Sequence, residues 1–291
     1  MAGERIGVTG STGGLGGRVA RRLADHGIGQ RLLVRDESRA PRLEHAAVAV
    51  IDGYDDADGM RRALQGIETL FFVSAAEDPD RVRLHRSAVD AAVAAGVQRI
   101  VYTSFVAAAP DSTFTFGRDH FHTEEHIKQA GVAYTFLRDS LYMDFVPLLC
   151  PPEGVIRGPA DEGRVAAVAR DDVADVAAAV LAGEGHDGET YDLTGIEAFT
   201  LGEAAAELSR VTGRHIAFEE ETVEEAFASR QSSGAPDYMI EGWVTTYTAI
   251  AAGDLERVSD CVERFCDREP QRLGDWLRAN PDSYRHLLHT S

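Results

Sequence analysis

The chain has 291 residues, of which 44% are hydrophobic and 26% are charged, and its formal net charge is -19. This composition is typical of globular proteins, and the length allows one large α/β domain or one domain with a smaller appendage. The negative charge argues against direct nucleic-acid binding, because a phosphate backbone would be repelled. Without an apolar run of transmembrane length or a leader segment, the sequence predicts a cytoplasmic protein that does not engage a membrane.

Three cysteines, Cys150, Cys261 and Cys266, are too few and too irregularly spaced for a disulfide framework. Cys261 and Cys266 lie five residues apart on a helical pattern without other ligand-type side chains nearby. Buried or idle thiols are therefore favoured over a zinc site, and we expect no metal centre.

A glycine-rich turn follows the first apolar run, residues 6–8, and precedes a helical pattern over residues 15–23. Its glycines, Gly10, Gly13 and Gly16, have the spacing G-x-x-G-x-x-G. In such strand–turn–helix elements the first glycine makes the turn, the second lets a pyrophosphate approach, and the third lets helix and strand pack closely. The anion lies on unpaired N–H groups at the helix N-terminus. The turn thus predicts a dinucleotide site rather than a purely structural glycine turn.

The residue at the end of the second predicted strand, residues 31–35, distinguishes NAD from NADP. An acidic side chain there bonds the 2′-hydroxyl of NAD, whereas an arginine accommodates the 2′-phosphate of NADP. Arg35 occupies this place, and the side chain of Asp36 is expected to point to the other side. The sequence therefore favours NADP(H), with a solvated surface arginine as the alternative.

Strands alternate with helices through six cycles, which predicts a doubly wound parallel sheet of the Rossmann type in the α/β class. The further predicted strands cover residues 47–51, 69–73, 99–104 and 133–137, and the longer helices cover residues 79–96 and 113–129. On the first of these helices, His85 is expected to be a surface or interface residue rather than a ligand.

Several strand ends carry residues suited to a ligand, because ligands gather at the carboxyl ends of strands in such sheets. Asp52 and Tyr54 follow the third strand, where an adenine contact and a simple turn are equally compatible with the sequence. Small residues, 74–76, follow the fourth strand and would leave room for a cofactor. Thr103 and Ser104 end the fifth strand at the same edge.

The pattern changes after Pro147, where residues 151–159 are rich in proline and glycine. We therefore expect residues 1–150 to form an NADP-binding Rossmann domain. Residues 151–291 would form a smaller mixed α/β substrate-binding part, whose strands can also return to the Rossmann sheet. The expected elements of this part are strands at residues 163–168, 189–193 and 215–218, a helix at 173–181 capped by Asp171 or Asp172, and helices begun by capping boxes at Thr200 and Thr222.

Together these motifs resemble the atypical short-chain dehydrogenase/reductases, in particular their NmrA-like group with its quinone-reductase branch. The resemblance covers about residues 5–220 and rests on residues 9–16, 33–35, 95–104, 120–124 and 131–138. It implies that NADP(H) is held by the glycine turn, by the arginine after the second strand, and by the segments after the fourth and sixth strands. The candidate cofactor-binding residues are Gly10, Ser11, Thr12, Gly13, Leu15, Gly16, Arg35, Ser74, Ala75, Asp139, Ser140, Leu141 and Tyr142, with Asp52 and Ser104 added from the strand ends.

One departure from the wider family concerns the proton donor. Most short-chain dehydrogenases carry Tyr-x-x-x-Lys on the helix after the fifth strand, and the tyrosine gives a proton to the carbonyl oxygen. By its spacing to Glu124, this chain has Phe116 at the tyrosine position and His120 at the lysine position. The candidate catalytic residues are His120, at the lysine position, and Tyr142, in the segment after the sixth strand. With an ordinary pKa near ~6.5, His120 would hold the nicotinamide ribose or relay a proton, unless it is simply a polar helix residue.

The resemblance implies an NADPH-dependent oxidoreductase that transfers hydride to a quinone or a similarly activated acceptor. A quinone oxygen accepts negative charge readily because the ring becomes aromatic, so a dedicated acid is less necessary. The alternatives are a non-catalytic NADP sensor that regulates a partner protein, and a reductase or isomerase of a biosynthetic pathway. The expected partner is a small-molecule acceptor, in the first place a quinone, bound by a monomer or homodimer.

Overall fold

The computed structural model describes residues 4–288, which divide into two compact units. The first unit comprises Met1–Pro110, Asp119–Arg138 and Arg170–Asp192, and the second comprises Asp111–Arg118, Asp139–Ala169 and Leu193–Ser291. Each unit thus collects segments that are far apart in the sequence. The functional division near residue 150 stays a prediction.

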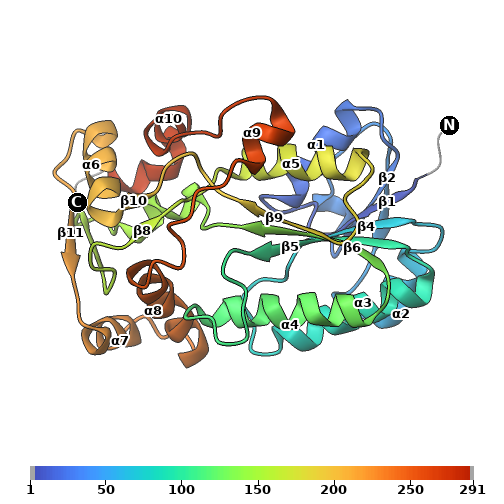
Figure 1. Ribbon diagram of the computed structural model, residues 1–291, viewed down its shortest axis with the longest axis horizontal. Helices are drawn as coiled ribbons and strands as arrows, with labels where there is room; N and C mark the ends of the chain where they lie inside the picture. Colours follow the sequence, from blue (N-terminus) through green and yellow to red (C-terminus); the bar gives the residue numbers. More distant parts are fainter. Residues whose placement is uncertain (1–3, 289–291) are drawn as a thin grey trace. The chain divides into compact units, whose positions relative to one another are not determined.

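The first unit is built on a sheet with the strand order β3-β2-β1-β4-β5-β6-β9 (Figure 1). The strands are β1 (Ile6–Val8), β2 (Gln30–Val34), β3 (Ala46–Val50), β4 (Thr69–Phe72), β5 (Arg99–Phe105), β6 (Ala133–Asp139) and β9 (Glu189–Leu193). The β1–β2, β1–β4, β2–β3 and β4–β5 pairings are parallel. The predicted doubly wound α/β class is confirmed, and the order reverses between β1 and β4, where such sheets bind ligands.

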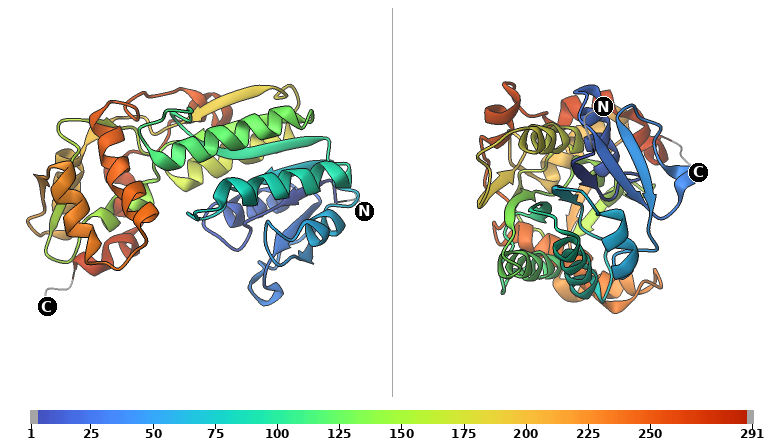
Figure 2. Two further views of the ribbon diagram at one scale, coloured as in Figure 1. Left: turned by 90° about the horizontal axis from the view of Figure 1, so that it is seen from below. Right: turned by 90° about the vertical axis from the view of Figure 1, so that its right-hand side faces the viewer.

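Helices cover both faces of this sheet (Figures 1 and 2). One face carries α1 (Gly16–Asp25) and α5 (Arg170–Ala182), and the other carries α2 (Ala57–Ala63), α3 (Arg81–Ala95) and α4 (Thr115–Gln129). Arg22 of α1 joins the first pair by donating to the carboxylates of Asp171 and Asp175 on α5. The strands and helices predicted up to residue 137 begin and end within two residues of those observed.

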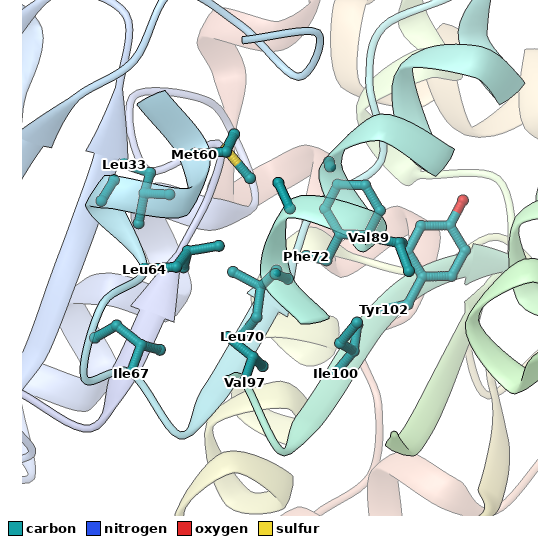
Figure 3. Packing of buried hydrophobic residues seen from close by; sticks show 14 of the residues in the cluster. Leu33, Met60, Leu64, Ile67, Leu70, Phe72, Val89, Val97, Ile100 and Tyr102 are labelled. Carbon is teal, nitrogen blue, oxygen red and sulfur yellow. The ribbon is translucent and has the colours of Figure 1, made fainter. Parts of the chain in front are cut away.

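Apolar side chains of the central strands form the core beneath α2 and α3 (Figure 3). Leu70 and Phe72 from β4 and Ile100 and Tyr102 from β5 are all fully buried. The rings of Phe72 and Tyr102 lie 5.3 Å apart between their centroids. Burial on this scale supplies most of the favourable free energy of folding, and it also brings the Tyr102 hydroxyl into the interior.

The second unit contains short strands and several helices, with two small sheets. Its elements are η2 (Met143–Phe145), η3 (Pro147–Leu149), β7 (Val155–Gly158), β8 (Arg164–Val165), β10 (Phe199–Thr200), α6 (Leu201–Thr212), β11 (Ala217–Glu220), α7 (Val223–Gln231), α8 (Asp237–Ala251), α9 (Cys261–Cys266), α10 (Leu273–Ala279) and η4 (Pro281–Leu287). β7 pairs with β11 in parallel, and β8 pairs with β10 in antiparallel orientation. The predicted capping boxes are confirmed at Thr200 with Glu203 and at Thr222 with Glu225.

Two local predictions were wrong. The strand expected at residues 163–168 is only two residues long, because the following backbone pairs with separate segments: the N–H of Ala166 donates to the Leu255 carbonyl, and that of Val168 to the Leu141 carbonyl. Asp171 and Asp172 do not cap α5 but lie inside its first turn, where carboxylates still favour the helix dipole. No helix within residues 4–288 is both long and apolar enough to cross a membrane.

Candidate cofactor site and buried polar network

The glycine turn has the backbone geometry that its sequence predicts. Gly10 has φ of 62°, in the left-handed region that side chains disfavour, and its carbonyl accepts the N–H of Gly13 at 2.9 Å. A Cβ on Gly16 would lie 2.4 Å from the Gly10 oxygen and 2.7 Å from the Thr9 oxygen. Glycine at position 16 is therefore needed for α1 to begin directly against the end of β1.

The middle of the turn is open and suits an anion. Thr12, Gly13 and Gly14 are exposed, and a Cβ on Gly13 would meet only the Gly10 oxygen, at 3.2 Å. No side chain among the described residues caps α1 at Leu15, and its first turn has no acidic residue. The free N–H groups at this helix end can therefore receive a pyrophosphate, which fits the dinucleotide expected from the sequence.

A cation beside the turn was not found from the sequence. A Cβ on Gly14 would lie 3.3 Å from both Cδ and Nε of Arg170, so the side chain of this arginine covers that part of the turn. Arg170 begins α5, far along the sequence from Gly14, and only the packing of α5 beside α1 brings the two together.

Arg35 is placed as expected for a reader of the 2′-phosphate. It follows β2 directly, is exposed, and makes no hydrogen bond or ion pair with the described residues. Asp36 is turned to its own backbone: its Oδ1 accepts from the N–H and the hydroxyl of Ser38 at 2.9 and 2.7 Å. These hydrogen bonds lower the pKa of Asp36. The carboxylate is thus engaged in capping a short helix, and Arg35 remains available.

Two further strand ends lie at this edge of the first unit. A Cβ on Gly10 would lie 3.0 Å from Cβ of Val73, which places the half-exposed Ser74 and Ala75 beside the glycine turn. Asp52 is exposed, and its N–H donates to Asp56. The cofactor contacts expected of these residues stay predictions.

The hydroxyl of Ser104 is already engaged in a buried cluster. It donates to Oε1 of Glu124 at 2.6 Å, and both Glu124 oxygens also accept from Arg138, at 2.8 and 2.6 Å. The pKa of Arg138 is raised, chiefly by its hydrogen bonds to Glu124. A cofactor contact by the Ser104 side chain would have to compete with this carboxylate.

The predicted contacts after β6 lie in the second unit. The Tyr142 hydroxyl donates to Oδ2 of Asp139 at 2.6 Å, and the N–H of Ser140 donates to the Leu193 carbonyl at 2.9 Å. Asp139 and Ser140 are buried, whereas Leu141 and Tyr142 are half-buried. The Tyr142 side chain is half-buried and its hydroxyl has a carboxylate partner, and the cofactor and catalytic roles of the segment stay predictions.

His120 lies in a buried polar network rather than at an open surface. Its Nε2 is 3.2 Å from a guanidinium nitrogen of Arg81, and its Nδ1 is 2.9 Å from the Tyr102 hydroxyl. Because a guanidinium only donates, Nε2 is the acceptor and Nδ1 carries the hydrogen that is donated to Tyr102. Burial and then the charge of Arg81 hold the pKa of His120 well below its usual value. The expected proton relay with an ordinary pKa is therefore not supported.

His85 is also buried, so its predicted surface position was wrong. Its Nε2 accepts the N–H of Ala75 at 2.8 Å, which leaves Nδ1 to donate to the Thr123 hydroxyl at 2.8 Å. Burial and the charge of Arg81 keep its pKa well below the usual value. The apolar spacing of α3 predicted the helix, but not that His85 would face the polar ends of β4 and β5.

Phe116, which the spacing to Glu124 places at the tyrosine position, has no hydroxyl to give a proton, and its assignment to that position stays a prediction. Its ring is buried in the second unit, where a Cβ on Gly242 of α8 would lie only 2.3 Å from a ring carbon. Glycine at position 242 is thus required for this packing, and the Phe116 ring serves as an apolar contact.

The chain matches known proteins along most of its length. A family model described as NAD(P)H-binding matches residues 10–184. Quinone oxidoreductase 2 of Escherichia coli (strain K12) is 34% identical over 256 residues, which cover 86% of this chain and 89% of that protein. A (4-alkanoyl-5-oxo-2,5-dihydrofuran-3-yl)methyl phosphate reductase of Streptomyces griseus is 34% identical over 282 residues, 95% of this chain and 98% of that protein.

A solved structure agrees with these matches. The NADPH-dependent quinone oxidoreductase of Escherichia coli, crystallised with NADPH, superposes with a TM-score of 0.86 at 30% identity. The match covers 94% of this chain and 99% of the other. It extends beyond the nucleotide-binding segments to nearly the whole chain.

Gly13→Val tests the open cradle. The valine side chain would occupy the space of the pyrophosphate while leaving the turn intact, so we expect a folded protein that no longer binds NADPH. Fluorescence titration with NADPH and thermal unfolding measure the two effects. Gly202→Val, at an exposed glycine in the first turn of α6, is the matched control and should bind normally. Normal NADPH affinity in folded Gly13→Val would contradict the site.

Arg35→Ala tests the choice of cofactor. Loss of a charge-assisted phosphate contact should weaken NADPH binding by about 1.5–3 kcal/mol and leave NADH binding unchanged. Titration of both cofactors measures the preference, with Arg61→Ala, at an exposed arginine of α2, as the control. An unchanged preference would show that Arg35 does not read the 2′-phosphate.

The two buried histidines predict acid-sensitive stability. In the unfolded chain they take up protons near pH ~6.5, whereas the folded protein keeps them neutral, so unfolding becomes more favourable as pH falls below that value. Each contributes up to ~1.4 kcal/mol per pH unit in that range and nothing above neutrality. Urea unfolding between pH 7.5 and 5.5 measures the slope. His120→Gln should reduce it, and His26→Gln, at an exposed histidine, should not.

Proposed function

Because the chain belongs to the NAD(P)H-binding family, within the NmrA-like group of atypical short-chain dehydrogenase/reductases, we propose that it is an NADPH-dependent oxidoreductase that reduces a quinone or a similarly activated acceptor. The turn at Gly13 and the exposed Arg35 support NADPH as the cofactor. NADPH, when bound, supplies the hydride.

The observation that carries the choice of acceptor is the absence of a positioned acid at the two family positions on α4. Phe116 has no proton to give, and His120 accepts at Nε2 from Arg81 and is neutral. A simple ketone needs a proton as charge develops on its oxygen, and removing a general acid typically costs on the order of 10²–10⁴ in rate. A quinone delocalises that charge into an aromatic ring and can take its proton afterwards.

The Streptomyces griseus relative supports the same class of acceptor. Its name describes a dihydrofuran whose ring double bond is conjugated with the ring carbonyl and with an alkanoyl group. Quinones and this lactone share an electron-poor double bond next to carbonyl groups. We therefore propose that this chain selects a conjugated, electron-poor carbonyl compound, with a quinone as the first candidate.

We assign each part of the proposed reaction to particular residues. Backbone N–H groups at the N-terminus of α1 bind the pyrophosphate, Arg35 binds the 2′-phosphate, and the backbone at Ser74 and Ala75 borders the dinucleotide. Tyr142 is the candidate proton source for the reduced acceptor, because its hydroxyl is half-buried and hydrogen-bonded to Asp139. Hydride and one proton together convert a quinone to the hydroquinone. His120 accepts a hydrogen bond from Arg81, so we give it a role in positioning Arg81 and not the role of an acid.

We also propose a binding role for each part of the chain, a location and an oligomeric state. Residues 1–150 bind NADP(H), and residues 151–291 bind the acceptor. The protein is a cytoplasmic monomer or homodimer. A non-catalytic NADP sensor is the alternative function, and it would bind NADPH without turnover.

The acceptor prediction is tested by following NADPH oxidation with 1,4-quinones and with simple ketones. We expect quinone reduction, and ketone rates lower by about 10²–10⁴, because neither Phe116 nor His120 supplies an acid at the family positions on α4. Phe116→Tyr should not gain ketone reduction, since its ring packs on Gly242, and Tyr142→Phe should slow quinone reduction. Robust ketone reduction by the wild type would refute the argument. Binding of NADPH without turnover of either class would favour the sensor.

A further inference from the structure

The three residues after β4, residues 73–75, are held by side chains instead of by neighbouring strands. β4 ends at Phe72, and its parallel pairing with β5 ends at the pair Phe72 and Tyr102. Beyond that point the chain continues along the carboxyl edge of the sheet beside the glycine turn, where Val73 packs on Gly10. Backbone groups there still need partners, because unpaired polar groups are costly when they leave water.

Val73 is held at both of its backbone groups. Its N–H donates to the hydroxyl of Thr9 at 2.9 Å, and its carbonyl accepts from the hydroxyl of Tyr54 at 2.5 Å. Thr9 is 1% exposed and comes from the end of β1, while Tyr54 comes from the loop after β3. Burial raises the pKa of Tyr54 to about 12, so its hydroxyl remains a donor at any physiological pH.

Ser74 and Ala75 are held in the same way from the other side. The N–H of Ser74 donates to the Thr103 hydroxyl at 2.9 Å. Nε2 of His85 accepts the Ala75 N–H at 2.8 Å, and Nε of Arg81 donates to the Ala75 carbonyl at 3.0 Å. The last two side chains come from α3, and both are almost completely buried.

We infer that these five side chains are positioning residues that hold residues 73–75 in the conformation that receives the dinucleotide. They share part-buried hydrogen bonds to this backbone and come from four separate parts of the first unit: Thr9, Tyr54, Arg81, His85 and Thr103. The inference rests on the NADPH binding proposed above, and it gives these side chains a role in holding residues 73–75 that the sequence analysis assigned to none of them.

The physical reason is preorganisation. Residues 73–75 are half-exposed, so one side remains open beside the glycine turn while the backbone is fixed from within. A loop that visited several conformations would bind NADPH only from its competent fraction, and the apparent Kd would rise in inverse proportion to that fraction. If the loop is already held in the competent conformation before NADPH binds, the affinity is not reduced in this way, because the entropy of ordering the loop is lost during folding and not during binding.

Single-atom substitutions separate positioning from mere stability. Thr103→Val removes the acceptor for the Ser74 N–H at nearly constant shape, and Thr103→Ser restores it. Tyr54→Phe independently removes the donor to the Val73 carbonyl. The control is Thr135→Val: Thr135 is fully buried in β6 and donates to the His186 carbonyl at 2.8 Å, outside this loop.

The experiment measures NADPH Kd by fluorescence, thermal unfolding, and hydrogen exchange of residues 73–75 in the free protein. For Thr103→Val and for Tyr54→Phe we expect Kd to rise about three- to tenfold, as for a lost hydrogen bond, with faster exchange in the loop. Thr103→Ser should match the wild type. Thr135→Val should lower the unfolding temperature without changing Kd or exchange in the loop.

Wild-type Kd and loop exchange in both Thr103→Val and Tyr54→Phe, with only a lowered unfolding temperature, would overturn the inference. Tyr54→Phe decides the matter if Thr103→Val does not fold. A wild type that fails to bind NADPH would refute the proposed function instead, and it would show no NADPH affinity in any variant. The two failures are therefore distinguishable.

Discussion

The candidate site depends on the close approach between the end of β1 and the beginning of α1. With any side chain at position 16, Cβ would lie 2.4 Å from the Gly10 carbonyl oxygen, and α1 could not begin there. Glycine at position 16 allows α1 to begin at this place. The unpaired N–H groups at the start of α1 therefore face the edge of the sheet where the strand order reverses between β1 and β4. The affinity for an anion thus arises from backbone packing, and charged side chains such as Arg35 refine it.

Buried polar groups fix the backbone conformation at the same edge of the sheet. Thr9, Thr103 and His85 are each nearly or fully buried, and each is paired with backbone or with another side chain. Such groups would be costly if unpaired, so each one restricts the conformation of the backbone that it contacts. Arg81 extends this restriction by bonding both the Ala75 carbonyl and His120. The result is a network of hydrogen bonds, in which both histidines are neutral, next to the proposed dinucleotide site.

This network also shapes the proposed chemistry. An arginine that donates to His120 leaves that ring without a proton to give from Nε2, and burial opposes protonation. Phe116, on the same helix, is an apolar contact for Gly242. Since neither family position supplies an acid, the proposed reaction relies on an acceptor that is already electron-poor. A quinone or another conjugated, electron-poor carbonyl compound, the class of acceptor proposed above, meets that requirement.

The sequence by itself determined the fold class, the succession of strands and helices along the chain up to the sixth strand, the glycine turn and the place of Arg35 after the second strand. These depend on local constraints: strand and helix periodicity, the conformational freedom of Gly10, and a residue's place at a strand end. It also identified Phe116 through its spacing from Glu124. Only the tertiary structure decided the states of His85 and His120, because a pKa depends on burial and on neighbours such as Arg81. It likewise brought Arg170 to Gly14, and Thr103 to Ser74, since those contacts join segments that are distant in sequence and meet only when the sheet and its helices have packed.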